Sequence, residues 1–218
     1  MKYKVILWDF DGTLADTGAD VWDSLKYAAG KLGGRMDEQF MRRDSNLGKP
    51  MEEIFRQVHP FPGEEKLSTF DKWVTIHYRT ISEYPKTRFY PGIQEILEQT
   101  CREGVQNYII TLKPEEALLR ILQKKGWSKW FTGCFSPDSF GEEKRTKAMV
   151  IADVMASQQE EPGQVVYIGD TFSDVNAAHE SGIPCIGVTY GDGDTDRLKA
   201  VGPDYLAENG EELQELLQ

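Results

Sequence analysis

Short apolar runs rich in β-branched and aromatic residues recur along the chain, and each is followed by a turn and then a helical pattern. Because these runs are nearly continuous rather than alternating, they predict strands that are buried on both faces of a parallel sheet. A chain of this kind favours an α/β domain in which helices cover the sheet. The runs span residues 5–8, 108–111, 165–168 and 185–190, with a weaker candidate at 131–135.

Helical patterns occupy the intervals between these runs. A proline opens the segment 114–126 and a glycine closes it, an arrangement that is typical of a helix. Strand and helix therefore alternate, which predicts a doubly wound parallel sheet, a Rossmann-like α/β core. The other helices that we expect here span residues 91–104, 147–155 and 176–180.

The region between residues 15 and 84 breaks this alternation, because it contains helical periodicity and no convincing strand. Three apolar stripes run through it, beginning at Val21, Met51 and Phe70. We therefore expect a helical bundle at residues 15–84, inserted into an α/β core that is made of residues 1–14 and 85–218.

Charge and cysteine content narrow the function classes. The formal net charge of −11 leaves no basic stripe to neutralise nucleic acid or an anionic membrane, although one pocket can still accept a small phosphorylated substrate. No stretch approaches the roughly 20 apolar residues of a membrane span. Three widely spaced cysteines predict reduced thiols in a cytoplasmic protein. They are Cys101, Cys134 and Cys185. The sequence leaves open whether the protein is a monomer or a homodimer.

Two carboxylates follow the first apolar run at once. Asp9 and Asp11 lie beyond the carboxyl end of a predicted strand, where open α/β sheets bind their ligands. Residues two apart on an extended chain point the same way, so both carboxylates can face one pocket. Such a pair suits one ionised nucleophile and one proton shuttle, whereas a lone pair of this kind more often ends a strand and caps a helix.

A second acidic motif follows the run at residues 165–168. Asp170 stands at that strand's carboxyl end, and Asp174 falls on the first turn of the next helix. Carboxylates that converge on one pocket repel each other unless a cation lies among them. An all-oxygen site with few protein ligands is typical of Mg²⁺, although Asp170, Thr171 or Ser173 could instead serve as a helix cap.

Two further positions could hold a phosphate group. Thr111 ends a predicted strand just before a helix, where a hydroxyl and free backbone N–H groups can bind phosphate oxygens. Lys147 lies near the start of another helix and could reach both the phosphate and Asp9. Lys144 and Lys113 are rival candidates for this lysine.

Together, in this order, the four motifs resemble those of the haloacid dehalogenase-like superfamily. The first motif of that family, D-x-D-G-T-L after an apolar strand, matches residues 9–14, and its G-D-x-x-x-D motif matches residues 169–174. Its second motif ends a strand in Thr or Ser, matched by Thr111, and its third supplies a lysine, best matched by Lys147. The resemblance covers essentially the whole chain.

The resemblance implies a phosphatase mechanism. In it, Asp9 attacks phosphorus to form an aspartyl-phosphate, and Asp11 first protonates the leaving alcohol and then activates water. Mg²⁺ is held by Asp9, Asp170 and the backbone carbonyl of Asp11. Asp174 is then a ligand through water or an orienting acid, while Thr111 and Lys147 neutralise the phosphoryl oxygens.

The inserted bundle resembles the helical cap of the phosphoglycolate phosphatase-like and β-phosphoglucomutase-like branches, a mobile lid that excludes water from the pocket. The resemblance makes Lys49, Arg42, Arg43 and Arg56 candidates for substrate recognition. One departure concerns the second motif, which in the phosphoglycolate branch reads Thr-Asn-Lys-Pro. Leu112 replaces the Asn here, so the match does not extend to a glycolate substrate.

Three alternatives to a phosphatase stay open. A phosphomutase differs only in where the aspartyl-phosphate goes next. A haloacid dehalogenase also uses a nucleophilic Asp but needs neither a metal nor a proton donor such as Asp11. A non-enzymatic binding module would be expected to have lost one of the four motif residues, and none is missing.

Overall fold

The protein is described here by a computed structural model that covers residues 1–141, 145–158 and 160–218. The chain divides into two compact units: an α/β unit of residues 1–16 and 88–218, and a helical unit of residues 17–87. The helical unit begins two residues later and ends three residues later than the expected segment 15–84. The reason is a short antiparallel ladder within the α/β unit, in which β2 (Ala15–Asp16) pairs with β5 (Arg88–Phe89).

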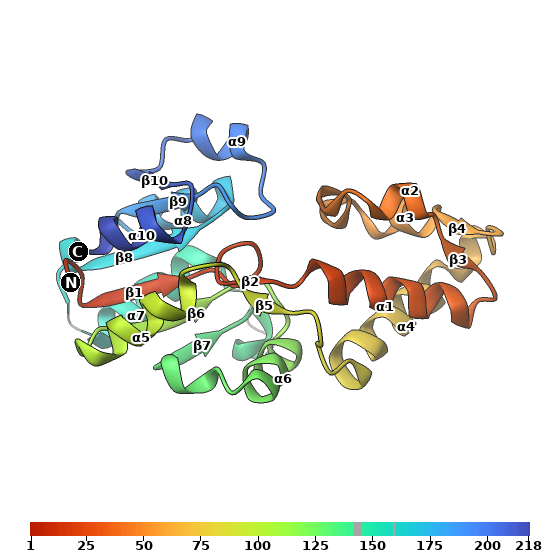
Figure 1. The fold of residues 1–218 in the computed structure, drawn as a ribbon, viewed down its shortest axis with the longest axis horizontal. Helices are drawn as coiled ribbons and strands as arrows, with labels where there is room; N and C mark the ends of the chain where they lie inside the picture. The colour runs from red at the N-terminus through yellow and green to blue at the C-terminus, as the bar shows by residue number, and fades with distance from the viewer. Residues whose placement is uncertain (142–144, 159) are drawn as a thin grey trace. The chain divides into compact units, whose positions relative to one another are not determined.

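A six-stranded sheet forms the centre of the α/β unit (Figure 1). Its strands run in the order β10-β9-β8-β1-β6-β7, and every neighbouring pair is parallel. Every residue of β1 and β8 is buried, as expected for strands covered on both faces. The prediction of a doubly wound α/β core is therefore confirmed. The strands are β1 (Val5–Trp8), β6 (Gln106–Ile110), β7 (Gly133–Phe135), β8 (Val165–Gly169), β9 (Cys185–Val188) and β10 (Tyr205–Ala207).

Helices follow the strands of this unit in the alternating order that the pattern predicts. The sequence did not reveal β10 or the helices on either side of it, because elements of so few residues carry too little periodicity. The helices are α5 (Ile93–Arg102), α6 (Glu115–Lys125), α7 (Lys147–Gln158), α8 (Phe172–Glu180), α9 (Thr195–Ala200) and α10 (Gly210–Leu217), with 3₁₀ turns η4 (Ser128–Trp130), η5 (Pro137–Phe140) and η6 (Pro162–Gln164).

Both faces of the sheet are covered. Side chains alternate along β1, so Val5 and Leu7 lie on one face, where they share an apolar cluster with α7 and α8. On the other face, Trp8 donates its indole N–H to the Asn107 side-chain oxygen (2.9 Å), and the Asn107 amide donates to Thr100 of α5 (2.8 Å). This packing makes β1 a rigid strand whose carboxyl end carries the first acidic motif.

The helical unit forms around its own apolar core. Two longer helices, α1 and α4, lie side by side, and Trp22, Leu25 and Phe70 are buried between the helices of this unit. A π-helical turn continues α4. The elements are α1 (Gly18–Lys31), α2 (Glu38–Met41), η1 (Asp44–Gly48), α3 (Met51–Phe55), η2 (Glu64–Lys66), α4 (Leu67–Ile76) and the π-helical turn η3 (His77–Ile81).

The expectation that residues 15–84 contain no strand is wrong. Within the helical unit, β3 (Arg35–Met36) pairs antiparallel with β4 (Val58–His59), and β2 lies at the start of the same region. Each of these strands has only two residues, too few to show a period-two alternation in the sequence. The apolar stripe that begins at Met51 therefore leaves the helix at Phe55, and Val58 belongs to β4.

Two observations bear on the surroundings of the protein. The structure records Cys101, Cys134 and Cys185 as free thiols. Among the described residues, no helix has the length and apolar character needed to cross a membrane.

Candidate active site

Three of the predicted site residues stand at the carboxyl ends of three adjacent strands. Because β1 lies between β8 and β6, Asp9, Asp170 and Thr111 emerge side by side at one edge of the sheet. All three residues are buried. The parallel arrangement thus brings together side chains that are far apart in the sequence, as expected at the carboxyl edge of an open α/β sheet.

Three carboxylates form a buried acidic cluster there. Asp9, Asp170 and Asp174 each offer an oxygen atom, and these atoms lie within 4.8 Å of one another. Burial raises the pKa of Asp170 to about 7, and the charges of Asp9 and Asp174 add to this rise. Burial likewise raises the pKa of Asp9 to about 6, although Lys147 opposes the effect. The cluster therefore resists full ionisation on its own.

Lys147 is the cation of this cluster. Its Nζ lies 3.0 Å from Asp9 Oδ1 and 2.5 Å from Asp174 Oδ1, and its side chain is almost fully buried. Burial alone would lower the pKa of Lys147, but the charges of Asp9 and Asp174 raise it, so the ammonium group stays charged. One lysine thus pairs with two of the three acids, and its single charge offsets only one of them.

Thr111 and Lys147, the two predicted phosphate-binding residues, line a common cavity of about 10 Å³, together with Ser136 and other residues. This volume is the size of one water molecule. The first amide of the following helix α6, on Glu115, donates to Asp138 (2.9 Å). One of the backbone N–H groups that we expected to be free for phosphate at the start of α6 is therefore already occupied.

Asp174 combines two roles. Its Oδ2 accepts hydrogen bonds from Thr171 Oγ1 (2.6 Å) and from the Thr171 amide (3.1 Å), so the two residues form a capping box at the start of α8. Its other oxygen contacts Lys147. Of the three residues that the sequence offered as a helix cap, Thr171 is the one that caps α8, and this cap also orients an acid of the cluster.

Asp170 is held by residues that the sequence did not single out. Its Oδ1 accepts from Thr13 Oγ1 (3.1 Å), and its Oδ2 accepts from the Gly193 amide (2.9 Å). Tyr190 donates its hydroxyl hydrogen to the Thr13 carbonyl (3.0 Å). The signal that could have revealed this loop is a Gly-Asp-Gly sequence after β9, at the same edge of the sheet as the other motifs.

Glycine is required in this enclosure, as Gly193 and Gly12 show. A Cβ atom on Gly193 would lie 2.1 Å from the Asp170 carbonyl oxygen, a contact that no side chain can relieve. Gly12 has a φ of 77°, in the left-handed region, and a Cβ there would lie 2.1 Å from Asp170 Oδ2. The backbone therefore approaches Asp170 from two sides and fixes its carboxylate.

Asp11 lies apart from the acidic cluster and has its own cation. Lys113 Nζ lies 2.8 Å from Asp11 Oδ1; the Lys113 side chain is 4% exposed and that of Asp11 is 40% exposed. The three candidate lysines are thus distinguished: Lys147 contacts Asp9, Lys113 contacts Asp11, and Lys144 lies outside the described residues.

The acidic cluster fits a hard divalent cation. Its ligand atoms are all carboxylate oxygens, which is the donor set that Mg²⁺ prefers. Three buried carboxylates, with Lys147 as the lysine between them in the described part of the chain, repel one another, and a cation at this point would relieve that repulsion.

Comparison with known proteins identifies the family. A family model described as haloacid dehalogenase-like hydrolase matches residues 6–188, which include the acidic cluster and both lysines. The chain belongs to this family.

Relatives cover the whole haloacid dehalogenase-like chain. A 5'-nucleotidase of Pseudomonas aeruginosa is 27% identical, over 100% of this chain and 97% of its own length. A phosphoglycolate phosphatase of Vibrio parahaemolyticus is 25% identical, over 98% of this chain and 96% of its own. The predicted family and enzyme class, a phosphoric monoester hydrolase, are thereby confirmed.

Solved structures share the fold. A haloacid dehalogenase-like family protein of Streptococcus pneumoniae is 26% identical with a TM-score of 0.79, over 100% of this chain and 99% of its own. A protein of Clostridium difficile is 24% identical with a TM-score of 0.85, and the match covers 100% of both chains. The α/β core with a helical insertion is thus a known architecture of this family.

The predicted substrate-recognition residues of this haloacid dehalogenase-like chain belong to the helical unit. Arg42 and Arg43 are exposed. Lys49 is also exposed and pairs with Glu53 of the same helical stretch (3.2 Å). The fourth candidate, Arg56, is exposed and pairs with Glu64 (2.9 Å). Their role in substrate recognition stays a prediction.

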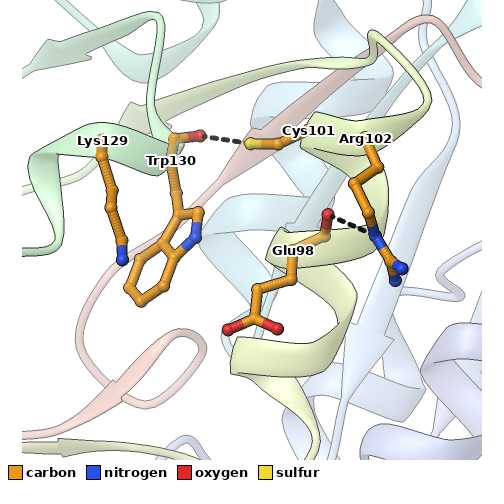
Figure 2. A pocket seen from close by; sticks show the side chains of 5 residues that line it. All are labelled: Glu98, Cys101, Arg102, Lys129 and Trp130. Carbon is orange, nitrogen blue, oxygen red and sulfur yellow. Dashed lines mark hydrogen bonds between the residues drawn. The ribbon is translucent and has the colours of Figure 1, made fainter.

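A separate surface hollow of about 510 Å³ lies between α5 and η4 (Figure 2). It contains none of the predicted site residues. Its lining thiol, Cys101, donates to the Trp130 carbonyl (3.6 Å), so the sulfur is engaged with the backbone. We therefore assign the chemistry to the strand ends and not to this hollow, which is lined by Glu98, Cys101, Arg102, Lys129 and Trp130.

Proposed function

We propose that this protein is a Mg²⁺-dependent phosphatase that hydrolyses a small phosphorylated metabolite through an aspartyl-phosphate on Asp9. The observation that carries the proposal is the separation of the acids. Asp9 lies in a buried cluster with Asp170 and Asp174, whereas Asp11 lies outside it and pairs with Lys113. This separation supports a role for Asp9, which also contacts Lys147, in binding the phosphoryl group, and a role for Asp11 in moving protons.

The first half of the reaction transfers the phosphoryl group. An Asp9 oxygen forms a bond to phosphorus as the bond from phosphorus to the substrate's ester oxygen breaks. Asp11 gives its proton to that oxygen, so the product leaves as a neutral alcohol. Lys147, which already contacts Asp9 at 3.0 Å, and the Thr111 hydroxyl stabilise negative charge on the phosphoryl oxygens.

The second half returns the enzyme to its starting state. Asp11, now ionised, takes a proton from a water molecule that attacks the phosphorus of the aspartyl-phosphate. The bond between phosphorus and the Asp9 oxygen breaks, which releases inorganic phosphate and restores the carboxylate. The exposed face of Asp11 suits this step, because 40% of its side chain is accessible to water.

Asp9, Asp170 and the backbone carbonyl of Asp11 would hold the metal ion, with Asp174 orienting the site through Lys147 and Thr171. When bound, Mg²⁺ supplies positive charge that offsets the phosphoryl oxygens and the clustered acids. The hydrogen bonds from Thr13 and Gly193 to Asp170 prepare that ligand before any ion arrives.

The substrate class is inferred from relatives and from the second motif. The names of two relatives describe phosphomonoesters of small molecules, a 5'-nucleotide and phosphoglycolate. Leu112 stands where the phosphoglycolate branch has Asn, and its side chain is 64% exposed. We therefore propose that the substrate belongs to the class of small phosphorylated metabolites.

Two measurements test this function. Phosphate release from p-nitrophenyl phosphate should stop in excess EDTA and return with Mg²⁺, and full turnover in EDTA would contradict the metal assignment. Rapid-quench mass spectrometry should detect covalent phosphate on the Asp11→Asn protein, in which hydrolysis of the intermediate is slow. The same covalent phosphate on the Asp9→Asn protein would overturn the assignment of the nucleophile.

A further inference from the structure

Lys113 is a buried cation that the reaction outlined above does not use. It lies two residues beyond Thr111, which directly follows β6, and its backbone amide donates to Thr111 Oγ1 (3.2 Å). Its ammonium group lies 2.8 Å from Asp11 Oδ1 and 5.6 Å from the centre of the Phe10 ring. Lysine is almost never fully buried unless it is paired, so this position calls for a physical reason.

The two partners of this ion pair differ in solvent exposure. The Lys113 side chain is 4% exposed, so surrounding atoms hold its stem, whereas the Asp11 side chain is 40% exposed. A carboxylate with that much open space can rotate towards solvent. A fixed ammonium group at 2.8 Å limits this rotation, because the charge-assisted hydrogen bond favours one orientation of Asp11.

Orientation matters for the role that Asp11 has in the proposed function. A proton donor must lie within about 2.6–3.2 Å of the atom that it protonates, and a displacement of about 1 Å can cost on the order of 100-fold in rate. We propose that Lys113 is a positioning residue, which holds the Asp11 carboxylate in the orientation that delivers its proton to the leaving oxygen. This inference rests on the proposed phosphatase function.

The two buried lysines then divide the work. Lys147 bridges Asp9 and Asp174 and supports the nucleophile, and Lys113 supports the proton shuttle. Both come from segments that follow strands of the same sheet edge, but they contact different carboxylates of the first motif. A lysine that only filled space would not need its ammonium group at hydrogen-bond distance from Asp11.

The test uses two size-matched phosphate esters with different leaving groups. p-Nitrophenolate leaves without help from an acid, whereas the alkoxide of benzyl phosphate needs a proton. The variant is Lys113→Met, which keeps the stem and removes the charge, and the control is Lys129→Met on the exposed turn η4. The quantity measured is kcat/KM for each ester, which reports the step that breaks the ester bond.

We expect Lys113→Met to lower kcat/KM for benzyl phosphate by about 10-fold or more, because general acid catalysis contributes about 10²–10⁴-fold in all. For p-nitrophenyl phosphate the loss should stay below about 3-fold. The ratio of the two values is independent of how much of the variant is folded. In an Asp11→Asn background, the same substitution should no longer change the ratio, because the two residues act as a unit.

Other outcomes would overturn the proposal. Equal losses for both esters would show that Lys113 supports packing or phosphate binding instead of proton delivery, and no loss for either would show that Asp11 needs no support. A loss that appears only with a benzyl phosphate carrying a ring carboxylate would reassign Lys113 to substrate recognition. Wild-type protein that releases phosphate from neither ester would overturn the phosphatase function itself.

Discussion

The two units of the molecule bury charge in opposite ways. In the helical unit, among residues whose burial is described, Asp20 is the buried charged residue, and it is fully satisfied. Its carboxylate accepts hydrogen bonds from the Thr87 amide (2.6 Å), the Thr87 hydroxyl (2.7 Å) and the Lys86 amide (3.1 Å). In the α/β unit, Asp9, Asp170 and Asp174 are instead buried against one another.

This difference separates structural from functional burial. Asp20 joins the first turn of α1 to the end of the helical unit, and every neighbour that it contacts offers a donor. In the α/β unit, burial and the charges of Asp9 and Asp174 raise the pKa of Asp170, an arrangement that costs stability unless a cation joins the acids. A site that is strained in isolation and relieved by its ligand is expected where binding and catalysis occur.

The largest contrast between lost activity and preserved stability should come from Asp9→Asn. Loss of the proposed nucleophile should lower phosphatase activity by at least about 10³-fold. Stability of the metal-free protein should stay equal or rise, because one of three repelling carboxylates is gone and Lys147 keeps Asp174 as its partner. Phosphate release and thermal unfolding measured on the same preparation check both parts. A variant that stays active but unfolds more easily would reverse the assignment of functional burial to this cluster.

The pH dependence of stability should reveal the same strain. Burial holds the pKa of Asp170 at about 7, above the ordinary value of about 3.9 in an unfolded chain. Between these pH values the folded state binds more protons than the unfolded state, so the free energy of unfolding falls as the pH rises. We expect a loss on the order of a few kcal/mol in metal-free wild-type protein, measured by urea unfolding from pH 4 to 7.5.

Two comparisons isolate this effect from the other carboxylates of the chain. Asp170→Asn should flatten the decline, because the amide does not titrate. Saturating Mg²⁺ should flatten it as well, because the cation favours the ionised cluster. A decline of equal slope in all three samples would place its origin outside the cluster.

Asp20→Ala should lower the stability of the protein, whereas Asp9→Asn should lower its activity. Three donors lose a buried charged acceptor, so unfolding should become easier by about 3 kcal/mol. The matched control is Asp23→Ala on the same helix, whose partly exposed carboxylate pairs with Lys86 and Lys26. Surface pairs of this kind contribute less than about 1 kcal/mol. Equal losses in urea titrations of the two variants would contradict the structural role of Asp20.

The sequence predicted those parts of the fold that leave a local signal. Continuous apolar runs indicated the central strands, and an acid directly after such a run indicated the site, as at Asp9 and Asp170. The two-residue strands β3 and β4 left no such signal, and their pairing depends on the packing of the helical unit. The elements α9, β10 and α10 at the end of the chain were also missed, because they too are short.

Parts of the site depend on tertiary contacts and could not be predicted. Three lysines were candidates for one role, because sequence spacing does not determine which ammonium group is buried or which carboxylate it meets. Lys113 and Lys147 were distinguished only by their distances to Asp11 and Asp9. The amide of Gly193 reaches Asp170 from a loop that follows a different strand, so no local pattern connects the two.

Gly193→Ala should weaken the metal site more than the fold. The new methyl group would lie 2.1 Å from the Asp170 carbonyl oxygen, so the loop must move and its amide leaves the carboxylate. Loss of a supporting contact to a metal ligand costs about 10- to 100-fold in affinity. Calorimetric titration with Mg²⁺ measures this loss, with Gly163→Ala as a control, since nothing lies within 4 Å of a methyl group there. Unchanged affinity would mean that Asp170 needs no support from this loop.

The smallest effects should come from the exposed cations of the helical unit. Lys49→Ala removes an ion pair with Glu53 in which both side chains are well exposed, so stability should change by less than about 0.5 kcal/mol. If Lys49 contacts the substrate as proposed, the Lys49→Ala substitution should raise KM by about 3- to 10-fold. The value of kcat should stay constant, which is the sign of lost ground-state binding. Lys26→Ala, an exposed lysine of the same unit that pairs with Asp23, is the matched control.

Steady-state kinetics with the best substrate of a phosphometabolite panel would decide between two descriptions of the helical unit. A higher KM for Lys49→Ala but not for Lys26→Ala would indicate that the helical unit contributes to substrate recognition. This unit would then combine exposed residues that bind substrate with a buried acid, Asp20, that stabilises the fold. Unchanged KM in Lys49→Ala, Arg42→Ala and Arg43→Ala would remove all three from substrate recognition. Specificity would then have to arise from other residues, with exposed Leu112 beside the second motif as the first to vary.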